Sequence, residues 1–202
     1  MNLCQEFFAE EATLQPVQVF SKLNDLAKAP FSAYFKVNDK YLLCSSPERF
    51  LKKAGNKLIS QPIKGTIKRG ATSAEDEQLK QQLLNSEKDR AENVMIVDLV
   101  RNDLNRSAVT GSVNVEELFG IYSFTNVHHM ISTVSATLRS EVHPVTAIKN
   151  AFPMGSMTGA PKIRAMQILD ELEHTKRGMY SGTVGFIMPS GTADFNVVIR
   201  SL

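Results

Sequence analysis

Apolar residues recur at helical spacing in four parts of the chain. The spacing predicts helices over 17–28, 72–104, 145–151 and 161–172. Asn85-Ser86 divides the second segment into two helices, and Ser73 is its expected cap because acids fill the turn that follows. Pro161 is expected in the first turn of the last helix, where the missing N–H is tolerated.

Shorter runs of aromatic and β-branched residues predict strands. They cover 2–8, 31–37, 41–45, 57–60, 113–118, 129–138, 183–188 and 193–199. Turn residues at 38–40 and 189–191 would close the first and the last hairpin. Because helices and strands are mixed and no repeat or linker is visible, we expect one α+β domain over residues 1–202.

Both ends of the chain look cut. Residues 2–8 begin directly in a predicted strand, and residues 199–202 end inside or just past another. We therefore expect a piece of a longer protein, truncated at both ends. Its open sheet edges could pair with a second copy of the chain.

Composition narrows the function classes. The chain is 43% hydrophobic and 22% charged, which is ordinary for a soluble globular protein. A net charge of +2 without a basic block argues against nucleic acid as a partner. Cys4 and Cys44 lack the spacing of a zinc site or a disulfide framework. No apolar run approaches a membrane span and no signal peptide is visible, so we expect a cytoplasmic protein.

Lys64 lies within Gln61–Thr66 (QPIKGT), between Pro62 and Gly65, residues typical of a tight turn. A lysine that is held on a stiff loop and partly desolvated can act as a base or nucleophile near neutral pH. The alternative is a solvent-facing loop lysine.

Two carboxylates could hold a metal. Asp89 and Glu92 are three residues apart and share one helix face, where they could bind a hard divalent cation. The alternative is a solvated helix start, at which acids favour the macrodipole. For Asp98, Arg101 and Asp103, further along the same helix, we expect structural ion pairs.

The segment Met154–Lys162 (MGSMTGAPK) places glycines and hydroxyls before a helix start. Free amides there would suit a carboxylate or phosphate, although a plain capped turn is equally compatible. The segment is not a P-loop, because the Gly-Lys-Ser/Thr ending is absent.

Three further polar residues are ambiguous when taken singly. His128 and His129 adjoin in a predicted strand and should point to opposite faces, one into a site and the other into the core or solvent. Glu48, a lone acid after Pro47, would ordinarily be a surface residue. No Gly-x-Ser-x-Gly elbow supports Ser-His-Asp hydrolysis.

Together these segments resemble the chorismate-binding domain of the family that includes anthranilate synthase component I, aminodeoxychorismate synthase component I, isochorismate synthase and salicylate synthase. The likeness is carried by NLCQEF, SSPERF, QPIKGTIKRG, KDRAENVMIVDLVRNDL, NVHHMIS, FPMGSMTGAPKIRAMQILDELE, RGMYSGTVGF and VVIR. The resemblance implies a sandwich of two antiparallel sheets flanked by helices, with the site between the sheets.

The resemblance also implies Mg²⁺ and an acid. Glu92 matches the magnesium-binding glutamate, with Asp89 as a neighbour that binds through water or shapes the site. Magnesium would meet the ring carboxylate of chorismate. Glu48 matches the general acid that assists loss of the 4-hydroxyl, and His129 matches the motif histidine beside the substrate.

Other residues would bind the substrate. Arg200 and Tyr180 match residues that hold the enolpyruvyl carboxylate, where a guanidinium fork suits two oxygens. Gly65, Thr66 and Ser156 would line the pocket through backbone or hydroxyl groups.

Lys64 indicates the branch of the family. Anthranilate and isochorismate synthases resemble each other in carrying alanine here, whereas Pro-Ile-Lys-Gly-Thr is similar to aminodeoxychorismate synthase. The implied mechanism is covalent: Lys64 attacks carbon 2, the 4-hydroxyl leaves with a proton from Glu48, and ammonia adds at carbon 4 and expels the lysine. A glutamine amidotransferase subunit would supply the ammonia, and the product, 4-amino-4-deoxychorismate, leads to p-aminobenzoate and folate.

The pattern also departs from the family. A following strand, a glycine-rich turn and a helix with a Glu-x-x-Glu pair, which carry carboxylate-binding amides and the second set of magnesium carboxylates, are absent from this sequence. Two alternatives stay open: anthranilate synthase component I, and an inactive chorismate-binding or assembly module. A fused partner domain and tryptophan binding are not decided by the sequence.

Overall fold

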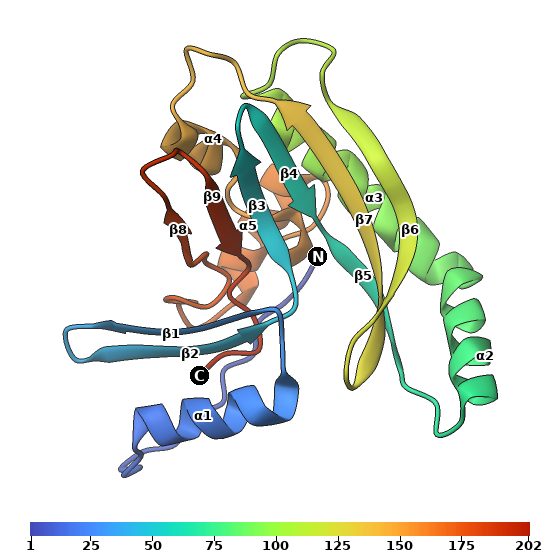
Figure 1. Ribbon diagram of the computed structural model, residues 1–202. Coiled ribbons are helices and arrows are strands. Elements are labelled where there is room, and N and C mark those ends of the chain that lie inside the picture. The colour runs from blue at the N-terminus through green and yellow to red at the C-terminus, as the bar shows by residue number, and fades with distance from the viewer.

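The computed structural model describes residues 1–202 (Figure 1). Its helices are α1 (Pro16–Ala27), α2 (Ser73–Leu84), α3 (Glu87–Asn105), α4 (Pro144–Ala151), the short 3-10 helix η1 (Gly155–Met157) and α5 (Lys162–Leu172). All the predicted helices are present. The cap of α2 is Thr72 rather than Ser73, because the Thr72 side chain accepts the Glu75 N–H at 3.2 Å. Pro161 is the cap of α5 and not part of its first turn.

The strands form one large sheet and one hairpin, and every pair is antiparallel. The strands are β1 (Phe31–Val37), β2 (Lys40–Ser46), β3 (Arg49–Ala54), β4 (Lys57–Gln61), β5 (Ile63–Lys68), β6 (Asn114–Ser123), β7 (Val127–Thr137), β8 (Gly185–Ile187) and β9 (Ala193–Asn196). β1 and β2 make the hairpin, and the other seven make the sheet. In that sheet β4 and β5 pair in succession with β7, and β6 pairs with the other edge of β7.

Three strand predictions were wrong. Residues 2–8 form no strand and are mostly exposed. Residues 49–54, for which no strand was expected, form β3, which pairs with β4 and β9. The expected turn at Gln61–Thr66 is mostly strand: from Ile63 onward it pairs with β7, and only the register shift between Ile63 and Thr66 interrupts the ladder. Long-range pairing explains the last difference, because short-range turn signals carry no information about a distant partner strand.

The main core lies between the sheet and a layer of helices formed by α3, α4 and η1. Figure 1 shows α3 running along the β5–β7 side of the sheet, while α1 lies below the β1–β2 hairpin. Ile96, Val100 and Leu104 of α3 meet Leu58 of β4 and Val134 of β7 in this core. Their four-residue spacing explains why the helix was predictable from the sequence.

The last residues of the chain run beside β2. Leu43 and Leu202 exchange both backbone hydrogen bonds at 2.9 Å, and Ser45 N–H donates to Arg200 O at 3.1 Å. This pairing brings the carboxyl-terminal segment against the turn that holds Glu48. None of the helices is long and apolar enough to cross a membrane.

Candidate active site

Glu48 is buried, contrary to the surface position expected for it. It lies between β2 and β3, where Val197 N–H donates to Glu48 O at 3.0 Å and the Ser46 hydroxyl accepts the Glu48 N–H at 3.2 Å. Its side chain is covered, and the residue is 5% exposed. Burial raises the pKa of Glu48 to about 7, because desolvation outweighs the opposing effects of the nearby Ser156 hydroxyl and the Lys64 charge. Near neutral pH this carboxyl can therefore give or take a proton.

Lys64 lies close enough to Glu48 for its charge to act on that carboxyl. It is half-buried in the irregular part of β5, between Ile63 and Thr66. Gly65 follows with φ +97°, in a region that side-chain-bearing residues rarely adopt. The backbone irregularity thus places an amine beside a buried carboxyl, which is an arrangement suited to nucleophilic or acid–base chemistry.

His129 and Thr66 are paired across β5 and β7. Thr66 Oγ1 and His129 Nδ1 are 2.8 Å apart, and the Phe124 ring meets the imidazole edge-on. Burial, and to a smaller extent the positive charge of Arg200, lowers the pKa of His129 to about 4. The imidazole is therefore neutral at physiological pH and can accept or donate a hydrogen bond without carrying charge.

Arg200 and Tyr180 come from adjoining segments. Ser181 N–H donates to Val198 O, and Val198 N–H donates to Gly182 O, both at 2.9 Å, so the chain around Tyr180 runs beside the segment that leads to Arg200. Tyr180 packs against the core, and burial raises its pKa. Arg200 is exposed and lines, with His129, a cavity of about 100 Å³. The exposed guanidinium beside a neutral imidazole is a suitable place for a carboxylate.

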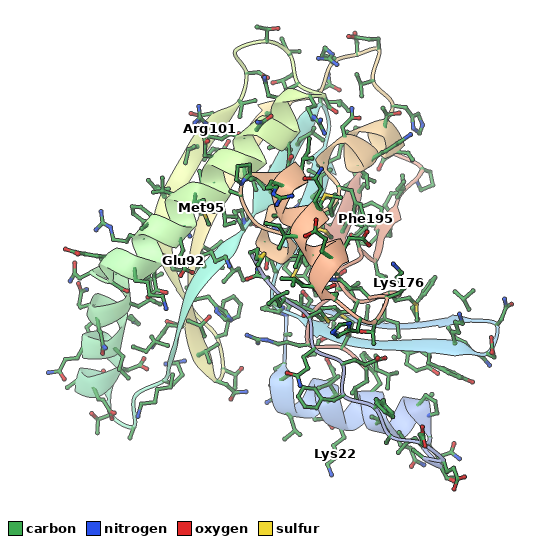
Figure 2. All side chains as sticks on the ribbon, turned by 180° about the vertical axis from the view of Figure 1, so that it is seen from behind. Lys22, Glu92, Met95, Arg101, Lys176 and Phe195 are labelled. Atoms are coloured by element: carbon green, nitrogen blue, oxygen red, sulfur yellow. The ribbon has the colours of Figure 1, made fainter.

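Asp89 and Glu92 lie near the start of α3, at the end closer to α2 (Figure 2). Ser86 caps the helix, and its hydroxyl donates to Asp89 Oδ2 at 2.5 Å. Glu92 is half-buried one turn further on. No cluster of three or more His, Cys, Asp or Glu side chains is arranged to hold a metal. Two carboxylates still fit Mg²⁺, which keeps several waters and uses few protein ligands.

The segment Met154–Lys162 folds over Glu48 and is held by several polar contacts. Lys162 Nζ donates to both carboxylate oxygens of Asp103, at 2.7 and 2.6 Å. Arg177 Nη1 donates to Met157 O at 2.9 Å. Ser156, within the segment, is buried, and its hydroxyl has no hydrogen-bond partner in the protein. Buried hydroxyls almost always have a hydrogen-bond partner. The position of Ser156 beside an acid therefore indicates that its hydroxyl bonds to another polar group.

The structure therefore brings the candidate residues together in part. Glu48, Lys64 and Ser156 form one group. A second group forms at the next part of the sheet, where Gly65 and Thr66 adjoin His129 and where the charge of Arg200 acts on that imidazole. Tyr180 does not join this group, because it lines a separate cavity with Glu173 and Arg177. Asp89 connects to this part of β5, because a Cβ on Gly65 would lie 3.2 Å from the Asp89 Cβ. No direct contact joins Glu92 to either group.

Two polar pairs were missed in the sequence. Asp103 was expected to pair within its own helix, as Asp98 and Arg101 do at 2.9 Å, but it pairs with Lys162 instead. The separation of 59 positions between these partners leaves no local signal for the pair.

His128 is fully buried, with its Nε2 2.9 Å from Asp76 Oδ1 and its Nδ1 2.9 Å from Ser123 Oγ. A bidentate contact from Arg69 is the main cause that lowers the pKa of Asp76. This network ties α2 to β7, while the neighbouring His129 reaches β5. The two adjacent histidines thus contact different elements, as their neighbouring positions in a strand predicted.

The sequence profile of the chorismate binding enzyme family matches residues 1–202. Among curated proteins, the chain is 45% identical over 202 residues to aminodeoxychorismate synthase component 1 of Salmonella typhimurium, covering 100% of this chain and 44% of that protein. It is 49% identical over 192 residues to the probable chloroplastic aminodeoxychorismate synthase of Oryza sativa subsp. japonica, covering 94% of this chain and 22% of that protein.

A solved structure shows the same fold. The crystal structure of anthranilate synthase component I from Streptococcus pneumoniae superimposes with a TM-score of 0.84 at 33% identity, covering 95% of this chain and 42% of that chain. The chain thus spans less than half the length of each of these relatives.

Proposed function

The chain belongs to the chorismate-binding enzyme family, and from this premise we propose that it is part of a synthase subunit that aminates chorismate to 4-amino-4-deoxychorismate. The observation that carries the proposal is the buried Glu48, whose pKa is about 7, within reach of the charge of Lys64. Identities of 45–49% to proteins called aminodeoxychorismate synthase support the same choice within the family.

Glu48 and Lys64 have complementary tasks in this reaction. The Lys64 amine forms a bond to carbon 2 of the ring, while the bond between carbon 4 and its hydroxyl breaks and Glu48 supplies the proton for departing water. Ammonia then bonds to carbon 4, and the lysine leaves carbon 2. An acid with a pKa near 7 is present in its protonated form often enough to act, whereas an ordinary glutamic acid is not.

The second group of residues would hold the substrate. The Arg200 guanidinium can form paired hydrogen bonds to a carboxylate, and Tyr180 on the adjoining segment can donate another. A neutral His129 avoids placing a second charge beside Arg200 and contributes a ring N–H or lone pair. Thr66 fixes that ring through the 2.8 Å contact.

Magnesium would be bound mainly by Glu92, with Asp89 acting through water or by shaping the site. When bound, the ion supplies positive charge for the ring carboxylate of chorismate. The Asp89 side chain is already oriented by Ser86, which suits an outer position better than a direct one.

The larger protein is also part of the proposal. The match to less than half of each relative supports a longer chain in which the seven-stranded sheet forms one side of a two-sheet sandwich. The name "component 1" carried by the Salmonella protein suggests a second component, and we propose a glutamine amidotransferase that delivers ammonia. A cytoplasmic setting stays a prediction.

Two other functions stay open. The 33% identity and common fold with anthranilate synthase component I favour production of anthranilate. The other is a module that binds chorismate without converting it.

Product analysis separates these functions. The purified chain is mixed with chorismate, Mg²⁺ and ammonium, and the products are identified by liquid chromatography and mass spectrometry. Aminodeoxychorismate that disappears in Lys64→Ala supports the proposal. Anthranilate from the native chain would replace it with the first alternative, and bound but unconverted chorismate would replace it with the second.

A further inference from the structure

A cavity of about 20 Å³ lies beside Glu48, enclosed by the sheet, α3 and the segment around Ser156. Ser60 and Pro62 line it from the sheet, Val100 and Asp103 line it from α3, and Ser156 lines it from the segment above. One water molecule needs roughly 10–15 Å³ of such space and two to four polar partners. The cavity therefore has room for one water.

The polar groups around the cavity fit that occupant. The Ser156 hydroxyl is buried and has no partner at normal hydrogen-bond distance, although it lies near enough to the Glu48 carboxyl to lower its pKa. Glu48, Ser60 and Asp103 belong to the same lining. A water at this position gives Ser156 its missing hydrogen bond and reaches at least one carboxyl group.

Asp103 also faces the outside. A groove of about 890 Å³ runs between α3, β6 and the start of α5, and Asp103 lines both this groove and the internal cavity. Figure 2 shows α3 and α5 on this face, with Met95 and Arg101 marking the α3 side of the groove. Lys162 Nζ donates to both oxygens of Asp103, at 2.7 and 2.6 Å. These contacts hold the carboxylate between the groove and the internal cavity.

We propose that Glu48 exchanges its proton with solvent through one water in the internal cavity and the carboxylate of Asp103. Asp103 takes a proton from water in the groove and passes it to the cavity water. That water gives one of its own protons to the Glu48 carboxylate, so that one proton moves inward and Asp103 is ionised again.

The charged groups around the route suit this order of events. Burial raises the pKa of Asp103, while Lys162 from α5 and Arg106 from α3 oppose that rise, so Asp103 can both take up and release a proton. Lys64 from β5 has the same effect on Glu48, but burial opposes it there and leaves Glu48 the stronger proton acceptor at neutral pH. If Glu48 acts as the acid in each catalytic cycle, it must be protonated again before the next one. The role of this route in turnover therefore rests on the proposed function. The exchange itself occurs without substrate.

The experiment measures the protonation of Glu48 directly. Its carboxyl infrared band is assigned from Glu48→Gln, and its growth is followed after a rapid drop in pH in the absence of chorismate. We expect Asp103→Asn to slow this protonation by at least about tenfold, since the relay group is lost. Asp98→Asn is the matched control, because Asp98 is an exposed carboxylate of α3 that lines the groove but not the cavity. It should leave the rate unchanged.

Two more variants keep the result interpretable. Removing one partner of a buried ion pair is costly, so Asp103→Asn is also combined with Lys162→Met, which removes the unpaired charge. Val197→Ile adds a methyl group to a residue that lines the cavity and should slow protonation where the added group excludes the water. Native protonation rates in the folded double variant would overturn the role of Asp103, and native rates with the cavity filled would overturn the role of the water. Neither result depends on whether chorismate is the substrate.

Discussion

Replacing Glu48 with Gln should remove a large part of the pH dependence of stability. Glu48 is 5% exposed, and burial raises the pKa of its carboxyl to about 7 from the ordinary value of 4.5. The folded state therefore binds this proton more tightly than the unfolded state does. The stability that the proton contributes is complete below about pH 4.5 and is lost as the pH rises through about 7. Glutamine is neutral at every pH and has no such loss.

The magnitude follows from the two pKa values. Each pH unit between them corresponds to about 1.4 kcal/mol, so the whole difference amounts to about 3 kcal/mol in the free energy of unfolding. For a chain of 202 residues this is about 6–12 °C in Tm. Other titrating groups, such as Asp76 and Asp103, contribute equally to both proteins and cancel in the comparison.

Urea unfolding at about pH 5 and about pH 8 measures the effect for both proteins. We expect the stability of Glu48→Gln relative to the native protein to improve by about 2.5 kcal/mol between the two pH values, because part of the titration lies outside this range. Glu171→Gln, which removes an exposed acid on α5, should show no such change. Parallel pH profiles for the native protein and Glu48→Gln would refute the reasoning, since Glu48 would then titrate alike in the folded and unfolded states.

Three further predictions concern other parts of the site. Glu92→Gln should weaken Mg²⁺ binding by about tenfold or more in isothermal titration calorimetry, and an unchanged affinity would remove Glu92 from the metal site. Gly65→Ala should lower stability by about 1–3 kcal/mol in urea unfolding, because φ is +97° and the new Cβ would lie 3.0 Å from the Leu83 side chain; a neutral effect would mean that β5 adjusts freely. Lys162→Met should cost about 3–5 kcal/mol by leaving Asp103 unpaired, and Asp103→Asn in the same chain should recover much of it; additive losses would contradict a coupled pair.

Local patterns were sufficient for much of the fold. The apolar spacing of α3 and the break before it at Asn85-Ser86, and the β1–β2 hairpin with its polar turn, depend on neighbouring residues and could be predicted. The segment 61–66 was misinterpreted because its pairing with β7 involves residues more than sixty positions away. The strand at Asn2–Phe8 was wrong because a suitable composition does not supply a partner strand.

The candidate site was likewise only partly predictable from the sequence. The resemblance to the family picked out Lys64 and Glu48 as partners, and the structure places them close together. The burial of Glu48 could not be predicted, because it depends on the return of residues 197–202 beside β2 and on the segment around Ser156. Asp103 was recognised only as a helix acid, since its connection to Lys162 and to both cavities appears only once the chain is folded.

The central claim is that the Lys64 amine bonds to the ring of chorismate, and peptide mass spectrometry tests it most directly. The protein is mixed with chorismate and Mg²⁺ without ammonia, quenched, digested and searched for a modified lysine. The account predicts an adduct on Lys64 that is absent in Lys64→Arg and that disappears when ammonium is added before the quench. Formation of aminodeoxychorismate by Lys64→Arg at the native rate, with no adduct on the native lysine, would contradict it.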